Sequence, residues 1–355
     1  MSDKSPTPQH RGRTTLALLA VALTATLVAA TLAGCGSSKK SSSSAPSELR
    51  IAYQLIPNGD LIVKDQGWLE KALPNTKIKW TQFASGGDVN TAVIAGSVDI
   101  GLAGSSPVAK GISLGTKYQV PWIFDVIGTA ESLVAKNSSG VKSIKDLVGK
   151  KVATPFGSTS HYSLLAALQE AGVDPAKVKI IDLEPQDILA AWQRGDIDAA
   201  YVWNPTLAAI EKDGTVLITS ADLAKRGKLT ADLAVVTTAF ANKYPSVVQT
   251  WVEQESRAVQ FFRDNSSEAS AAISRQLNIT PADALSQAKQ LIFLDASEQA
   301  GATYLGTPGA PGALAVNLAS AAQFLKQQSQ VDTVPPLATF QAALANQFVA
   351  KAAGK

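Results

Sequence analysis

The sequence predicts an α/β protein with two lobes. Strand-like and helix-like segments alternate from Glu48 to Val202, which is the pattern of βαβ units and indicates parallel sheets. The 355-residue chain is also longer than one compact core usually needs. Segments 92–107 and 190–205 share a helix–glycine–strand–proline pattern. We interpret this likeness as one supersecondary unit used once per lobe, although any βα unit shares part of it. Ligands bind at the carboxyl ends of such strands.

The first 48 residues are expected to be a targeting segment and a tether. Residues 1–13 are polar and basic, residues 14–34 carry no charge, and the motif LAGC ends at Cys35. This order is typical of a signal peptide, and a cysteine at the first mature position can carry a thioether-linked lipid. We predict a signal peptide over 1–34, lipidation of Cys35 and a Ser-rich tether over 35–48. The alternative is an uncleaved anchor helix, because the apolar run is about long enough to span a bilayer.

The remaining elements follow from local patterns. Short apolar or alternating runs predict strands at 49–53, 78–83, 98–103, 151–155, 178–183 and 199–202. Apolar periodicity bounded by glycine or proline predicts helices near 67–70, 88–95, from 107, 160–171 and 186–194. After Val235 the pattern predicts amphipathic packing helices at 244–263, 281–292 and 312–327.

Charge and residue counts exclude several kinds of site. The chain has 32 basic and 29 acidic side chains; without residues 1–34, which hold three basic and one acidic, 29 and 28 are left. This balance is no sign of nucleic-acid binding. The single cysteine excludes an intrachain disulfide, and two histidines, His10 and His161, exclude a zinc site built on several histidines. We expect no cofactor and no metal.

Two hydroxyl-rich loops are candidates for binding an anion. Gly104–Pro107 (GSSP) and Gly157–Tyr162 (GSTSHY) each follow a predicted strand and precede a predicted helix. A helix start offers unpaired N–H groups and the positive end of the helix dipole. Ordinary helix capping is the simpler interpretation of either loop alone. One loop in each lobe, however, could hold an oxyanion between two helix starts. Nucleotide phosphate is not expected, because the chain lacks a P-loop motif.

Two acids and one tryptophan are further candidates. Glu131 in TAESLVA and Asp232 in TADLAVV each precede a strand-type run where the chain is expected to cross between lobes. A carboxylate there could pair with a ligand ammonium; a strand-end acid exposed to water is the alternative. Trp203 follows a strand in YVWNP and could either wall the pocket or pack in the core.

Four segments carry a resemblance to a known family: STSHYSLLAAL (158–168), AAWQRGDIDAAYVW (190–203), AGSSP (103–107) and AYQ (52–54). They resemble the aliphatic sulfonate, nitrate and thiamine-precursor solute-binding proteins of ABC importers, and within that family the members that bind taurine. The likeness spans about 49–345. It implies a two-lobed periplasmic-binding-protein type II fold with the ligand cleft between the lobes. We accordingly expect lobe 1 over 49–132 and 233–355, with C-terminal helices, and lobe 2 over 133–232.

The resemblance also implies roles for particular residues. It implies sulfonate contacts at Ser105, Ser106, Ser158 and Thr159, ammonium contacts at Asp232 and Glu131, and a pocket lined by Gln54, Tyr162 and Trp203. One departure is that the relatives carry a tryptophan soon after the acid that matches Asp232, whereas this chain has Leu233 and Ala234. A less aromatic wall would accept a longer sulfonate.

The function implied by the resemblance is that of a substrate-binding lipoprotein. It would capture taurine or a related sulfonate and deliver it to the permease, and through it to the ATPase subunits, of an ABC importer. We expect a monomer anchored by lipid to the outer face of the cell membrane, on the periplasmic side in a host with an outer membrane. The alternatives are a binding protein for alkanesulfonate, nitrate or a thiamine precursor, an enzyme with His161 as its one candidate base, and a structural lipoprotein without a ligand. We expect binding and no catalysis.

Overall fold

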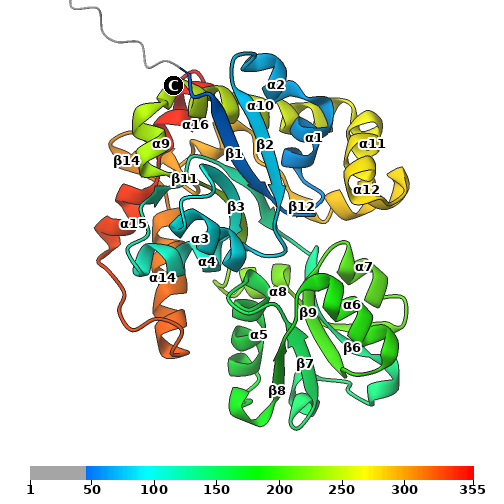
Figure 1. Cartoon of the computed structure of the whole chain (residues 1–355). Coiled ribbons are helices and arrows are strands. Elements are labelled where there is room, and N and C mark those ends of the chain that lie inside the picture. Colours follow the sequence, from blue (N-terminus) through cyan, green and yellow to red (C-terminus); the bar gives the residue numbers. More distant parts are fainter. Residues whose placement is uncertain (1–44) are drawn as a thin grey trace, which may run out of the picture. The chain divides into compact units, whose positions relative to one another are not determined.

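The computed structural model describes residues 45–355, which form two separate β-sheets flanked by helices (Figure 1). The expected signal peptide, Cys35 and the tether up to Ser44 lie outside the described residues. The fold itself begins earlier than expected, because Glu48 is already in a strand and the Pro46 carbonyl accepts a hydrogen bond from the Thr76 hydroxyl. None of the helices within residues 45–355 has the length and apolar character needed to cross a bilayer.

The first sheet defines lobe 1 and has the strand order β12–β5–β11–β3–β1–β2, with β4 paired to β11. Its strands are β1 (Glu48–Tyr53), β2 (Lys77–Gln82), β3 (Ile100–Gly104), β4 (Tyr118–Gln119), β5 (Ile123–Ile127), β11 (Ala231–Thr237) and β12 (Leu291–Ile292). Its helices are α1 (Gly59–Gln66), α2 (Trp68–Ala72), α3 (Gly86–Ile94), α4 (Ser105–Ser113), α9 (Thr238–Lys243), α10 (Pro245–Asp264), α11 (Ser266–Leu277), α12 (Pro281–Ala288), α13 (Ala296–Gln299), α14 (Leu314–Gln327), α15 (Leu337–Ala343) and α16 (Asn346–Ala352). A small hairpin joins β13 (Gly306–Thr307) to β14 (Ala310–Pro311).

The second sheet defines lobe 2 and has the order β10–β6–β9–β7–β8. Its strands are β6 (Glu131–Lys136), β7 (Lys151–Thr154), β8 (Lys179–Asp182), β9 (Ala199–Trp203) and β10 (Gly214–Thr219). Its helices are α5 (Thr159–Glu170), α6 (Pro185–Arg194), α7 (Thr206–Ile210) and α8 (Ser220–Ala224), with 3₁₀ turns η1 (Asn137–Ser139), η2 (Ile144–Leu147) and η3 (Pro175–Lys177).

The prediction of parallel sheets is right only in part. β1, β2 and β3 are parallel, as are β7, β8 and β9, but β11 runs antiparallel to β3 and β5, and β6 runs antiparallel to β9 and β10. β6 and β11 are the strands that follow the two crossovers, 128–130 and 225–230. The first strand after each crossover therefore runs antiparallel to the parallel strands of the sheet that it joins.

Local sequence explains where two helices of lobe 1 begin and end. Asn58 caps α1 by accepting a hydrogen bond from the Asp60 N–H, and Gly67 ends it in the left-handed conformation that glycine adopts without strain. The helix expected over 281–292 ends at Ala288 instead, because Leu291 and Ile292 pair with β5. Tertiary pairing with a neighbouring strand outweighs helix periodicity there.

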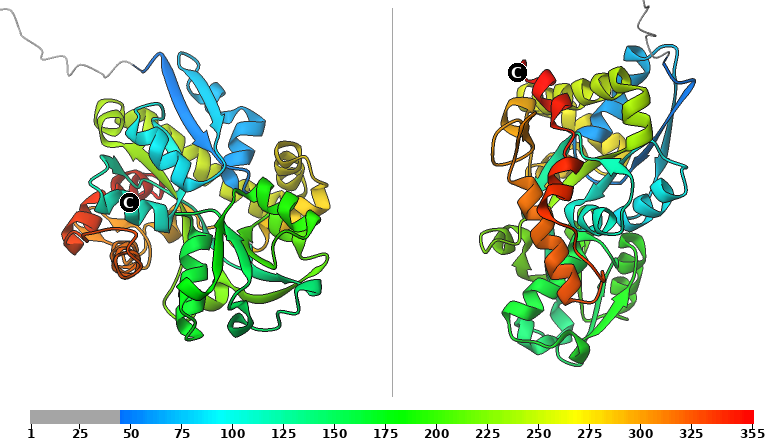
Figure 2. Two further views of the ribbon diagram at one scale, coloured as in Figure 1. Left: turned by 60° about the horizontal axis from the view of Figure 1, so that its bottom comes forward. Right: turned by 90° about the vertical axis from the view of Figure 1, so that its left-hand side faces the viewer.

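The main hydrophobic core extends from lobe 1 into the α5 side of lobe 2, and a smaller cluster lies under α6 and α7. α14 connects the lobes at this core, since its Phe324 ring packs edge-on against Tyr162 of α5 at a centroid distance of 4.9 Å. Figure 2 shows α14, in orange, running down from lobe 1 beside lobe 2. The lobes are thus joined by two crossovers and one packed helix.

Candidate functional site

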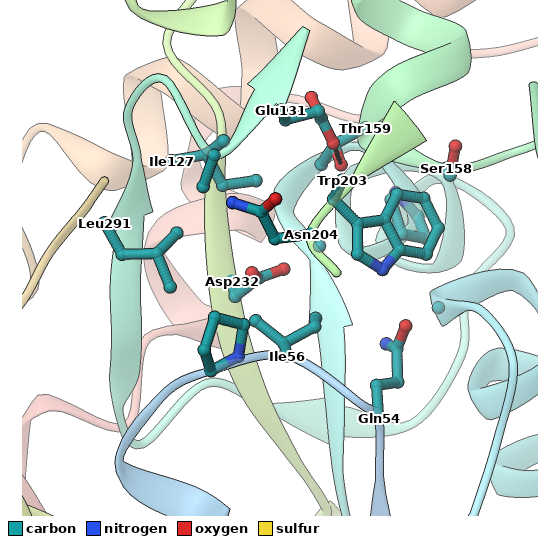
Figure 3. Close-up of a pocket in the computed structure, with 15 residues that line it drawn as sticks. Gln54, Ile56, Ile127, Glu131, Ser158, Thr159, Trp203, Asn204, Asp232 and Leu291 are labelled. Atoms are coloured by element: carbon teal, nitrogen blue, oxygen red, sulfur yellow. Dashed lines mark hydrogen bonds between the residues drawn. The ribbon is translucent and has the colours of Figure 1, made fainter. Parts of the chain in front are cut away.

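A pocket lies between the two sheets and is lined from both lobes (Figure 3). Six residues predicted from the sequence line it, namely Gln54, Glu131, Ser158, Thr159, Trp203 and Asp232. Both members of the segment pair 92–107 and 190–205 end at this pocket, since Gly104 and Pro107 line it from lobe 1 and Trp203 and Asn204 from lobe 2. The carboxyl ends of strands from two sheets therefore meet at one place, as expected for a ligand site in α/β proteins.

Three helix N-termini converge on one side of the pocket. Gly86 begins α3, Gly104 caps α4 and Ser158 caps α5, and all three line the pocket. A Cβ at Gly104 would lie 2.5 Å from Thr159 Cγ2, and a Cβ at Gly86 would lie 3.1 Å from the Gly104 nitrogen. Glycine is required for this close approach. No side chain caps α3 or α4, so their first N–H groups are available to an anion.

The hydroxyl groups at these helix starts already bond to the protein. Ser105 Oγ accepts from the Ala231 N–H at 3.2 Å, which ties α4 to the start of β11. Ser158 Oγ accepts from the His161 N–H at 3.1 Å and donates to the Pro155 carbonyl at 2.6 Å. An anion here can receive hydrogen bonds from the backbone N–H groups of the helix starts, one of the two kinds of donor that the sequence suggested.

Glu131 is the acceptor of a buried hydroxyl network. Its carboxylate accepts from Thr159 Oγ1 at 2.5 Å, from Ser220 Oγ at 2.7 Å and from Ser163 Oγ at 3.4 Å. The side chain is only 1% exposed, and this burial raises its pKa while the three hydroxyls oppose the shift. Glu131 therefore holds the start of α5 to β6 and lines the pocket at the same time (Figure 3).

Asp232 forms an acid pair with Asp125. The two face each other in the β11–β5 pairing, and Asp125 Oδ2 accepts from Asn58 Nδ2 at 3.2 Å. Asp125 is 0% and Asp232 6% exposed. Burial raises the pKa of Asp125 to about 7, and burial, together with the charges of Asp125 and Glu131, raises the pKa of Asp232 well above its usual range. Such a pair is costly to ionise fully without a positive partner.

The rest of the wall is mixed. Gln54 donates from Nε2 to the Leu102 carbonyl at 3.0 Å and lies across the pocket from the Trp203 indole (Figure 3). Asp232 is directed into the pocket between Ile56 and Asn204 (Figure 3). Apolar side chains complete the lining, namely Ile56, Pro57, Ile127, Ala130 and Leu291.

Several residues singled out in the sequence do not line the pocket. Ser106 is buried in the first turn of α4, and Tyr162 packs against Phe324. Leu233 and Ala234 are fully buried in β11, so the structure does not support the idea that they form a pocket wall. His161 accepts from the Gly157 N–H and stacks on Phe156 at 4.5 Å, and burial lowers its pKa to about 4.

Three features of the site were missed in the sequence. Asp125 stands inside the apolar run WIFDVI, and an acid within a buried strand is a signal that could have identified it. Asn204 follows Trp203 directly and donates from Nδ2 to Gln290 Oε1 at 2.8 Å, which links the lobes. Gly86 lies in SGGD, a glycine pair at a helix start that marks close approach. Among residues 45–355 no group of three or more His, Cys, Asp or Glu side chains is arranged to hold a metal ion.

A two-lobed α/β protein whose lobes share a polar pocket has the architecture of a periplasmic solute-binding protein. Residues 43–276 match the NMT1-like family, and the chain belongs to that family. The taurine-binding periplasmic protein of Escherichia coli strain K12 is 37% identical over 290 residues, which cover 80% of this chain and 88% of that protein.

Two solved structures show the same fold. The alkanesulfonate-binding protein of Xanthomonas axonopodis pv. citri, bound to MOPS, superposes with a TM-score of 0.69 at 21% identity and covers 84% of this chain and 98% of its own. A desulfurization enzyme superposes with a TM-score of 0.62 at 15% identity and covers 87% and 99%. Binding proteins and an enzyme therefore share this architecture, and function has to be argued from the pocket.

Proposed function

We propose that the protein binds a small zwitterionic sulfonate, taurine or a close relative, and delivers it to the permease of an ABC importer. The observation that carries this proposal is the polarity of the pocket. Uncapped helix N-termini and the buried carboxyl of Asp232 line the same pocket, and Asp232 is paired with Gly104 across β11 and β3. A ligand with an anionic and a cationic end separated by a short chain complements both kinds of group.

The anionic end fits the helix starts. A sulfonate carries its charge at all physiological pH values and has three acceptor oxygens. Backbone N–H groups and helix dipoles stabilise such a group without a full counter-charge. The N-termini of α3, α4 and α5 converge closely enough that Gly86 and Gly104 leave no space for a Cβ.

The cationic end fits Asp232. An ammonium group supplies the positive partner that this buried carboxyl otherwise lacks within residues 45–355. A plain alkanesulfonate has no ammonium and would leave the carboxyl unpaired, which costs about 1–3 kcal/mol or more for a buried polar group. The 37% identity to a taurine-binding protein over most of both chains supports the same assignment.

An alkanesulfonate is the second candidate. Ile56, Ile127, Leu291 and the Trp203 ring give the pocket an apolar wall that an alkyl chain could contact. The fold of an alkanesulfonate-binding protein is also shared. The buried acid pair favours taurine over this alternative.

Location, assembly and mechanism belong to the same proposal. We infer that the protein acts outside the cytoplasm as a monomer, anchored by a lipid on Cys35 after removal of residues 1–34. Closure of the lobes at 128–130 and 225–230 would enclose the ligand and mark the loaded state for the permease. His161, the one candidate base, packs in the α5 loop, which supports binding rather than catalysis.

The test is calorimetric titration of residues 36–355 with taurine and, separately, with ethanesulfonate. We expect tight binding of taurine and binding of ethanesulfonate that is at least tenfold weaker. Asp232→Asn should reduce taurine affinity by about tenfold to a hundredfold while leaving ethanesulfonate affinity nearly unchanged. Preference for ethanesulfonate would favour the second candidate, and absence of binding to both would overturn the sulfonate assignment.

A further inference from the structure

We propose that Asp125 is a second carboxylate of the ligand's cation site, that it shares one proton with Asp232 before an ammonium arrives, and that ammonium binding releases this proton to solvent. This inference rests on the proposed function and adds a residue and a mechanism to it. It makes uptake sensitive to external pH and restricts the ligand to compounds whose amine is protonated and can donate hydrogen bonds.

The geometry of the two acids supports a shared proton. They are opposite each other on adjacent antiparallel strands, with Asp232 in the pocket lining and Asp125 fully buried outside it, and each carboxyl acts on the ionisation of the other. Two carboxylates this close in a buried site repel each other strongly, and a shared proton removes the repulsion and forms a hydrogen bond.

The hydrogen bonds of Asp125 leave one position open. Oδ2 accepts from Asn58 Nδ2, but Oδ1 is buried and has no hydrogen-bond partner among residues 45–355. Buried acceptors without partners are rare, and they require a donor from a ligand, a water or a proton. A proton on the pair, or an ammonium N–H beside it, supplies that donor.

The charges around the pair do not supply a cation. Asp125 is contacted from β11 by Asp232, from the α1 start by Asn58 and, through space, by the Glu131 carboxylate. Asp232 is next to Gly104 of β3 and faces the same Glu131 charge. Within the described chain, no lysine or arginine acts on either acid. The ligand is therefore the source of positive charge at this site.

The exchange is balanced in charge and in protons. Before binding, the pair holds one proton and carries one negative charge. The ammonium brings one positive charge and two or three N–H donors, the pair gives its proton to water, and two carboxylates then face one ammonium. No covalent bond forms, and no electron is transferred.

The experiment is calorimetric titration with taurine at pH 8, above the pKa of about 7 of Asp125, in two buffers of different ionisation enthalpy. The difference between the observed heats gives the number of protons released, and we expect a value close to one. We also expect the taurine Kd to rise up to about tenfold for each pH unit lowered below the midpoint of the pair. Ethanesulfonate should release no proton and show no such pH dependence.

Asp125→Asn separates this inference from the function on which it rests. Asparagine keeps the shape and can still accept from Asn58, so we expect a folded protein that binds taurine at least fivefold more weakly. With no carboxylate opposite Asp232, the midpoint of the pH profile should move down by about one pH unit or more. Glu255→Gln, which removes a buried carboxyl that does not line the pocket, is the matched control and should release the same proton as the unchanged protein.

The outcomes are distinct. If taurine binds tightly but releases no proton, and its affinity is flat from pH 5.5 to 8.5, the shared proton is wrong while the proposed function stands. An Asp125→Asn variant with an unchanged affinity and pH profile would also overturn the inference. If taurine does not bind at any pH, the proposed function itself has failed.

Discussion

Thr159 shows how one side chain can serve the ligand indirectly. Its hydroxyl donates to buried Glu131 at 2.5 Å, and its methyl group lies beside Gly104 of the opposite lobe. The same residue contributes the first helical N–H of α5 at the pocket. A buried Glu131 carboxylate requires hydrogen-bond donors, and Thr159 supplies one of them. Thr159 therefore attaches α5 to β6 as well as lining the pocket.

Thr159→Val should therefore destabilise the protein. Valine has nearly the same shape but cannot donate to Glu131, so the buried carboxylate loses its shortest hydrogen bond. We expect the free energy of unfolding to fall by about 1–3 kcal/mol, as measured by urea denaturation. Thr159→Ser keeps the hydroxyl and should lose less than half as much. Equal stability of the valine and serine variants would contradict this account.

Individual pocket residues were predictable where the local pattern carried their chemistry. Ser158 and Thr159 stand at a helix start, and Asp232 precedes an apolar run, so their places in the pocket follow from the chain itself. The run WIFDVI marks Asp125 as a buried acid, but its pairing with Asp232 comes from the strand that lies opposite it. The hydroxyls of Ser105 and Ser158 likewise form hydrogen bonds with the Ala231 N–H and the Pro155 carbonyl, which only the folded chain brings close.

The α1–α10 contact contains a second buried acid pair. Asp60 of α1 and Glu255 of α10 are each 1% exposed and lie within hydrogen-bonding reach of each other. None of their four carboxyl oxygens has another hydrogen-bond partner among residues 45–355. Burial raises the pKa of Asp60 to about 7, and burial with the Asp60 charge raises the pKa of Glu255 well above its usual range. We expect the two carboxyls to share a proton, and the resulting hydrogen bond would join the two helices.

This pair predicts that stability falls as pH rises. An acid whose pKa is higher in the folded than in the unfolded chain contributes its full stability below the unfolded pKa of about 4, and that contribution is lost as pH rises through 7. We expect this proton to make the unfolding free energy decrease by up to about 1.4 kcal/mol per pH unit between about pH 4 and 7. Urea denaturation at pH 5 and 7.5 measures this change.

Glu255→Gln is the control for this effect. Glutamine can donate to Asp60 without a titrating proton, so the fall in stability between pH 5 and 7.5 should shrink. The Asp125–Asp232 pair adds a change of the same sign in the ligand-free protein, and Asp125→Asn measures that part separately. A pH dependence that is the same in the unchanged protein and in Glu255→Gln would count against the proton at α1–α10.

The positions of strands and helices along the chain were more predictable than the order in which the strands pair in the sheets. Alternation and capping signals identified β1–β3, β7–β9 and the helices α2, α3, α5 and α6 but not α1, because those patterns are local. The position of β11 between β3 and β5 depends on a segment that returns after more than a hundred residues. Its apolar run fits either strand direction, so the sequence carried no signal for the antiparallel pairing.

The two lobes meet through small, specific contacts near the pocket. Ser85 Oγ donates to Glu184 Oε1 at 3.2 Å, Asn204 donates to Gln290, and Gly104 lies against Thr159. These contacts involve few atoms. The lobes are joined more firmly by the two crossovers and by the packing of Phe324 against Tyr162. Such an arrangement suits a molecule that opens at the pocket while staying joined elsewhere.

Gly104→Ala tests this closed arrangement. The added Cβ would meet Thr159 Cγ2 at 2.5 Å, so the lobes could no longer approach as closely. We expect taurine affinity to fall by about tenfold to a hundredfold with little change in the thermal midpoint of the ligand-free protein. Gly87→Ala is a matched control, because its Cβ would make only an ordinary 3.5 Å contact with the Phe156 carbonyl. Equal affinities for the two variants would show that close approach at Gly104 is not needed.

The pairing of Ala231 with Val126 means that lobe 2 leaves and re-enters lobe 1 at neighbouring positions. Segment 128–230 is in this sense an insertion, and a host tolerates exchange of such a segment when its two ends are close together. The α5 start and Trp203 belong to the insert, whereas Asp125 and Asp232 belong to the host. Exchange of this segment would replace part of the pocket wall, including the proposed anion site, as a single unit and would leave Asp125 and Asp232 in place.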